Sequence, residues 1–83
     1  MTKEIKLLWN KGDITFIQYV YQNSRLNKQE REVAKLILCE NITQEEASEK
    51  LDISTRGLKY IWKSACEKIL SVPGVKPYID SLN

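Results

Sequence analysis

Three cations at helical spacing are the residues of this sequence best suited to a chemical task. With Leu58 as zero and about 100° per residue, Arg56, Lys59 and Lys63 fall near about 160°, 100° and 140°. Tyr60 lies beside them, near about 200° on the same scale. Lysine and arginine in such a basic stripe bind phosphates and the base edges of nucleic acid. The alternative is an ordinary solvated helix face.

The opposite side of the same segment is apolar. Between about −60° and +40° on this scale lie Leu58, Ile61, Trp62, Ala65 and Ile69. A recognition helix needs this division, because one face packs while the other enters the major groove of DNA. The preceding residues 40–52 are acidic, so an acidic short segment comes before a basic long one.

Catalytic chemistry finds little support in the residue types present. The chain of 83 residues has no histidine, the usual general base and metal ligand. It also lacks a Ser-His-Asp set, a metal-ligand cluster and a phosphate-cradling glycine loop. Glu45 and Glu46 are better interpreted as residues that favour a helix start. We therefore expect no enzyme activity, no cofactor, no metal and no small-molecule ligand.

The two cysteines form no CxxC pair. Each sits in an apolar helical pattern, so we expect Cys39 and Cys66 to be reduced thiols in the core. A disulfide between two packed helices is the less favoured alternative in a chain without a secretory signal.

Capping signals define the elements that would position the basic stripe. Asn27 with Glu30 is a capping arrangement for a helix of about three turns. Thr43 with Glu46 is a full capping box for a helix of about eight residues. Ser54 is a good N-cap for a third helix over 55–70. A short capped helix, a tight connection and a longer helix are the layout of a helix-turn-helix.

The two ends of the chain are less distinctive. A short helix is expected over residues 3–10. Residues 14–23 have strand-like composition, but Asp13 is a good N-cap and the apolar spacing favours a helix. The apolar residues of this region either complete the core or form a partner surface. In the tail, Pro77 is expected as the first residue of a final helical turn, with a partner-binding tail as the alternative.

Composition and length set the fold class. The apolar share of 42% and the charged share of 29% argue against disorder, and the net charge of +2 says little about partners. We predict an all-α small helical bundle that contains a helix-turn-helix. It would be a single domain over 1–83, with an N-terminal helical extension (1–25), the helix-turn-helix unit (26–70) and a tail (71–83). No membrane segment or signal peptide is recognised, so a cytoplasmic protein is expected.

Residues 26–70 resemble known DNA-binding families. Leu26-Asn-Lys-Gln-Glu-Arg-Glu-Val33, Thr43-Gln-Glu-Glu-Ala-Ser-Glu-Lys-Leu-Asp-Ile-Ser54 and Leu58-Lys59 look like the DNA-binding domain of LuxR/GerE-type regulators. They are also similar to region four of bacterial sigma factors. The chain departs from the LuxR-type pattern at Gly57, where threonine is preferred, and at Ser48, where alanine is usual.

The resemblance implies roles for particular residues. It implies that Lys59, Tyr60 and Lys63 occupy DNA-contacting positions of the second helix of the motif, and that Thr55 and Arg56 lie at its N-terminal end. It also implies that Glu30 holds a commonly acidic structural position.

Two functions follow as hypotheses. The first is a sequence-specific transcriptional regulator of bacterial or phage type that binds double-stranded DNA, as a homodimer or with RNA polymerase. Its predicted DNA-binding residues are Gln44, Ser54, Thr55, Arg56, Lys59, Tyr60 and Lys63. The alternative is a sigma-like protein-interaction module that binds RNA polymerase or another regulator rather than DNA.

Overall fold

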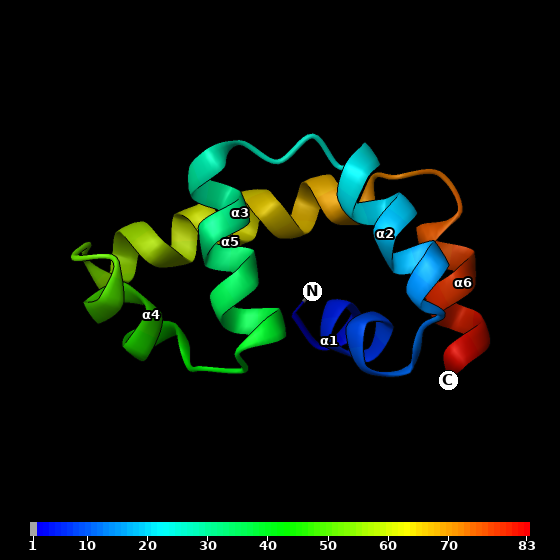
Figure 1. The fold of residues 1–83 in the computed structure, drawn as a ribbon, viewed down its shortest axis with the longest axis horizontal. Coiled ribbons are helices and arrows are strands. Elements are labelled where there is room, and N and C mark those ends of the chain that lie inside the picture. Colours follow the sequence, from blue (N-terminus) through cyan, green and yellow to red (C-terminus); the bar gives the residue numbers. More distant parts are fainter. Residues whose placement is uncertain (1) are drawn as a thin grey trace. The chain divides into compact units, whose positions relative to one another are not determined.

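Helices form the framework of the chain. The computed structural model describes residues 2–83, and no strand occurs among them. In chain order the helices are α1 (Thr2–Lys11), α2 (Ile14–Asn23), α3 (Lys28–Ala34), the π-helical η1 (Lys35–Cys39), α4 (Gln44–Lys50), α5 (Thr55–Leu70) and α6 (Val75–Leu82) (Figure 1). The all-α fold class predicted from the sequence is confirmed.

Contacts divide the chain into two compact units. The first consists of residues 2–25 and 66–83, and the second of residues 26–65. The second unit therefore matches the predicted helix-turn-helix segment, except that the end of α5 belongs to the first. The segments predicted as an extension and a tail lie together in the first unit. The interpretation of the whole chain as a single domain stays a prediction.

A polar cap and a glycine set the boundary between α1 and α2. Oδ2 of Asp13 accepts hydrogen bonds from the N–H groups of Thr15 (3.0 Å) and Phe16 (3.2 Å). Asp13 is thus the N-cap of α2, and the helix interpretation of this segment is confirmed. Just before it, the Gly12 N–H donates to the Leu8 carbonyl at 2.8 Å. A Cβ on Gly12 would lie only 2.4 Å from that oxygen, so glycine is needed for this close approach.

The first unit has an apolar core and a polar contact, made by Tyr78, between α6 and the start of α2. Its buried apolar residues are Ile5, Leu8, Val20, Cys66, Ile69, Val72, Val75 and Ile79. Helix α1 packs against α6. The ring of Tyr78 stacks on Phe16 with centroids 4.1 Å apart, and its hydroxyl accepts the Asp13 N–H at 2.7 Å. Tyr78 thus ties α6 to the start of α2.

The C-terminal segment contains more helix than the sequence predicted. Gly74, in the left-handed region with φ +89°, precedes the first residue of α6, Val75. The prediction that Pro77 begins the helix is therefore wrong, because Pro77 is its third residue. The first-turn N–H groups of a helix have no carbonyl partner, so proline is tolerated there. This segment packs on the rest of its unit: Ile79 is buried and Tyr78 half-buried.

Burial of Cys66 leads to a prediction about pH. Its side chain is 1% exposed, and this burial raises the pKa of the thiol from 9.0 to about 12. Folding thus favours the protonated thiol. The contribution of Cys66 to the free energy of unfolding is therefore constant below about pH 9 and declines as pH rises toward about 12. Urea unfolding should show that Cys66 lowers the free energy of unfolding near pH 10 by about 1 kcal/mol, relative to its value below about pH 9. A Cys66→Ala variant that loses as much stability over the same pH interval would contradict the prediction.

Two helices of the second unit, α3 and α4, each start with a capping box, and both boxes were predicted. Asn27 Oδ1 accepts the Glu30 N–H at 2.8 Å, and Glu30 Oε1 accepts the Asn27 N–H at 2.9 Å. Thr43 Oγ1 accepts the Glu46 N–H at 3.1 Å, and Glu46 Oε1 accepts the Thr43 N–H at 3.3 Å. These reciprocal bonds fix where α3 and α4 start.

The second half of the predicted first helix of this unit is π-helical. In η1 the Glu40 N–H donates to the Lys35 carbonyl at 3.1 Å, five residues back. Cys39, at the end of η1, is exposed, so the prediction that it lies in the core is wrong. It comes two residues after the buried Ile37 and therefore lies on the opposite side of the helix. Both cysteines are free thiols.

A buried carboxylate connects the first helix of this unit to α5. Glu30 is 3% exposed, and its Oε2 accepts a hydrogen bond from the Ser64 hydroxyl at 2.5 Å. Its Oε1 closes the capping box with Asn27. The acidic position implied by the resemblance is therefore both a cap and a contact between helices.

Removal of this carboxylate is expected to destabilise the chain. Glu30→Ala breaks the capping box and leaves the Ser64 hydroxyl without this acceptor, for a combined cost of about 2 kcal/mol. Urea unfolding followed by circular dichroism measures it. Glu32→Ala is the matched control, because Glu32 is exposed on the same helix. Equal effects of the two substitutions would show that the buried bonds contribute nothing.

Candidate nucleic-acid interface

The turn between α4 and α5 is a well-formed helix stop. Asp52 adopts the left-handed conformation with φ +54°, and its N–H donates to the Glu49 carbonyl at 3.2 Å. The Ile53 N–H donates to the Ser48 carbonyl at 3.0 Å. This pair of bonds is a Schellman motif, which satisfies the last carbonyls of α4 and reverses the chain. The helix-turn-helix layout therefore rests on backbone hydrogen bonds.

Ser54 starts α5, as predicted. Its Oγ accepts the Gly57 N–H at 3.0 Å. A Cβ on residue 57 would lie 3.1 Å from that oxygen, which is a tight contact. Glycine at this departure from the LuxR-type pattern therefore leaves room for the cap.

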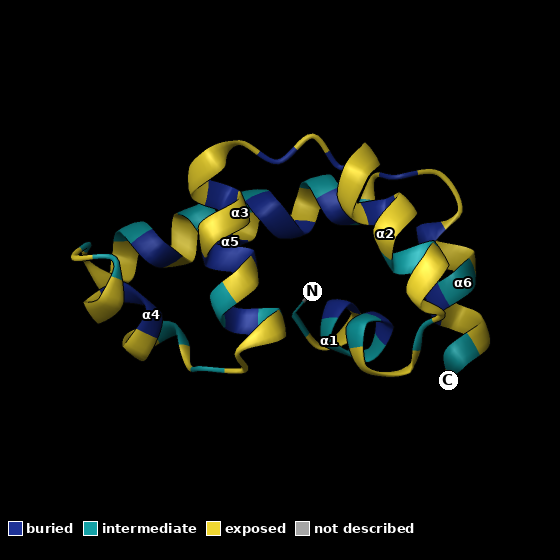
Figure 2. Cartoon of the chain, in the orientation of Figure 1, coloured by how far each residue is buried: buried dark blue, intermediate teal, exposed yellow. Residues whose placement is uncertain are grey.

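The structure confirms the division of α5 into two faces. Leu58, Trp62 and Ala65 are buried. Arg56, Lys59 and Lys63 are exposed, so the basic stripe is a surface feature. Figure 2 shows buried and exposed stretches alternating along α5. Ile61, at the edge of the predicted apolar face, is only half-buried.

Tyr60 is the most exposed large hydrophobic residue of the second unit, at 78%. Thr55, at the first position of α5, is also exposed. Both were predicted site residues, and both side chains can reach an external partner. An exposed aromatic side chain beside cations can contact the methyl group of thymine in the major groove.

No ion pair within residues 2–83 neutralises the basic stripe. An ion pair of this unit joins Lys50 to Glu40, 3.6 Å apart, on other elements. The positive charges of Arg56, Lys59 and Lys63 therefore stay available to an anionic partner.

The start of α4 lies next to the basic stripe. An open hollow of about 470 Å³ is lined by Thr43, Gln44, Glu45 and Lys59. The structure thus brings together two predicted site residues, Gln44 and Lys59. Thr43 and Glu45 are neighbours that sequence reasoning did not place in the site. Their only signal was their adjacency to Gln44, because the packing of α4 near α5 is not visible in local spacing.

No family model, no curated protein and no solved structure matches this chain. The likeness to LuxR/GerE-type domains therefore rests on the residues quoted above and stays a resemblance. The site is accordingly built from its own geometry.

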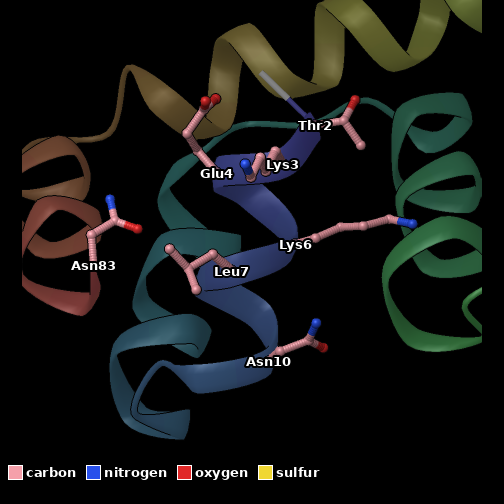
Figure 3. Close-up of a pocket in the computed structure, with 7 residues that line it drawn as sticks. All are labelled: Thr2, Lys3, Glu4, Lys6, Leu7, Asn10 and Asn83. Carbon is pink, nitrogen blue, oxygen red and sulfur yellow. The ribbon is translucent and has the colours of Figure 1, made fainter.

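A second hollow lies in the first unit. It has a volume of about 770 Å³ and is lined by Thr2, Lys3, Glu4, Lys6, Leu7, Asn10 and Asn83. Figure 3 shows the side chains of Glu4 and Lys6 projecting to different sides of α1 rather than toward one point. We assign no chemistry to this hollow.

Residues 2–83 contain no group of three or more Cys, Asp or Glu side chains arranged to hold a metal ion. None of the described helices is both long enough and apolar enough to cross a membrane.

Proposed function

We propose that the second unit binds duplex DNA by placing the exposed face of α5 in the major groove, and that the protein regulates transcription. The observation that carries the proposal is the surface of α5, where three exposed cations, none ion-paired within residues 2–83, lie beside Tyr60 and opposite a buried apolar face. A short capped helix and a tight turn precede it. This is the arrangement by which helix-turn-helix proteins read DNA.

Each residue of the interface has a distinct role in this proposal. Arg56, in the first turn of α5, donates to base edges, because the N-terminal part of a recognition helix lies deepest in the groove. Lys59 and Lys63 neutralise phosphates along the backbone. Thr55 and Tyr60 add hydrogen bonds or contacts with thymine methyl groups.

The α4 side of the interface fixes the position of the protein on the duplex. Gln44 and Lys59 line the same hollow, so their side chains can contact adjacent backbone groups. The Ser54 hydroxyl, which already caps α5, can donate its proton to a phosphate oxygen. Glu45 repels phosphate from its own part of the hollow and can accept a hydrogen bond from a cytosine amino group.

Fluorescence anisotropy with a labelled random-sequence duplex tests DNA binding itself. The expected result is micromolar affinity that weakens steeply as salt rises, because phosphate contacts release condensed counterions. Absence of binding at low salt would reject the proposal.

A protein-interaction role is the second candidate. Glu45, Glu46 and Glu49 are exposed on α4, and this acidic surface suits a basic protein better than DNA. In this case purified RNA polymerase, or another regulator, would bind the chain, and charge reversal at Glu45 and Glu49, which leaves the capping box of Glu46 intact, would abolish that binding. Failure to bind polymerase or any transcription factor would eliminate this candidate.

A further inference from the structure

Helix α2 carries an exposed apolar stripe that the proposed DNA interface does not use. Ile14 is 71% exposed and Tyr21 39% exposed. Between them lie Ile17, which is half-buried, and Gln18, which is exposed. The spacing i, i+3, i+4, i+7 places the four side chains on one helix face, and we call them the α2 stripe. This is the pattern by which one helix packs against another.

The charge pattern around the α2 stripe is unusual for this chain. Charged residues make up 29% of the sequence, yet residues 14–24 contain none. The uncharged stretch is bounded by exposed residues of opposite sign, Asp13 before it and Arg25 after it. The uncharged helix α2 is therefore preceded by an acidic N-cap residue and followed, two residues after its end, by a basic one.

We propose that the α2 stripe binds the same stripe of a second copy of this chain, with the two helices antiparallel. A two-fold symmetric interface apposes identical patches, and a stripe without charge does not repel itself. Antiparallel pairing places Asp13 near Arg25 of the partner subunit, and the symmetry repeats this pair at the other end. It also places each helix N-terminus beside the partner's C-terminus, so the helix dipoles attract.

The size of the stripe sets the strength of the pairing. A helix of ten residues is about 15 Å long, so the contact falls below the roughly 800 Å² per partner of a standard interface. The pair is therefore weak in solution. On a duplex with two adjacent half-sites the pairing should become stronger, because the DNA holds the two copies close together. This strengthening rests on the proposed function, whereas the pairing itself does not.

Sedimentation equilibrium of the full chain without DNA tests the pairing. Ile14→Asp puts a charge in the stripe but keeps the helix start, where an acidic residue is favourable. Thr15→Asp adds the same charge on the same turn, on a different side of the helix. Wild type and Thr15→Asp should show concentration-dependent dimers, and Ile14→Asp should be a monomer at every concentration. A monomeric wild type, or equal dimerisation of the two variants, overturns the proposal.

Disulfide trapping tests the antiparallel geometry. The centre of the stripe lies between Ile17 and Gln18. Two copies of Gln18 are therefore offset by about 1.5 Å along the helix axes, and two copies of Tyr21, on the same face, by about 10 Å. In a Cys39→Ser background, Gln18→Cys should form a crosslinked dimer several-fold faster than Tyr21→Cys, because bridged Cα atoms must lie close together. Equal rates, or faster crosslinking of Tyr21→Cys, overturn the antiparallel pairing. Neither experiment contains DNA, so both outcomes are independent of the proposed function.

Discussion

Replacement of Arg56, Lys59 and Lys63 by alanine is expected to weaken DNA binding by about 100-fold or more, because loss of each such contact costs at least about 1 kcal/mol. The same triple substitution should lower the slope of log affinity against log salt by about 2, since Lys59 and Lys63 are the proposed phosphate contacts and each such contact contributes about 0.9. Anisotropy titrations of wild type and variant at several salt concentrations measure both quantities. All three side chains are exposed and none is ion-paired within residues 2–83, so the fold should be unaffected.

A second triple variant controls for net charge. Lys3, Lys11 and Lys76 are exposed in the first unit, and their replacement by alanine removes the same charge from the molecule. This control should bind DNA with nearly wild-type affinity and an almost unchanged salt slope. If the two triple variants weaken binding equally, the basic stripe has no special role.

Leu58→Ala is expected to have the largest effect on stability. Leu58 is fully buried and lies on the inner face of α5 in the second unit. Truncation of a buried leucine costs about 2–5 kcal/mol, which is a large part of the stability of a small domain. Urea unfolding should therefore shift to much lower denaturant. Because Trp62 lies in the second unit, its fluorescence in a Trp9→Phe background follows this unit directly.

Tyr60→Ala is the matched control on the same helix. Tyr60 is 78% exposed, so its truncation should change the free energy of unfolding by no more than about 0.5 kcal/mol. The two faces of α5 thus differ: the inner face stabilises the fold, and the outer face is the proposed partner surface. Similar destabilisation by Leu58→Ala and Tyr60→Ala would contradict that difference.

Local signals predicted most of the helix boundaries. The caps at Asp13, Asn27, Thr43 and Ser54 act within three residues of the chain, so their hydrogen bonds can be foreseen from spacing alone. The two faces of α5 follow equally from helical periodicity. Where the determinants are local, sequence was sufficient.

Contacts between distant residues were beyond the reach of the sequence. The hydrogen bond between Asp13 and Tyr78 joins residues 65 positions apart, and the one between Glu30 and Ser64 joins residues 34 apart. The π-helical geometry of η1 also lacked a local signal, whereas the exposure of Cys39 follows from its position two residues after the buried Ile37. In the candidate site, the hollow that joins Gln44 to Lys59 depends on how α4 packs near α5, so Thr43 and Glu45 were missed.

NMR mapping of the DNA-bound surface tests the central claim most directly. Titration of the isotope-labelled full chain with a short duplex should produce its largest amide shift changes over residues 54–63 and at Gln44. Changes confined to α1, α2 or α6 would contradict the account, because they would place the DNA on the first unit. Absence of any change at low salt would contradict it as well.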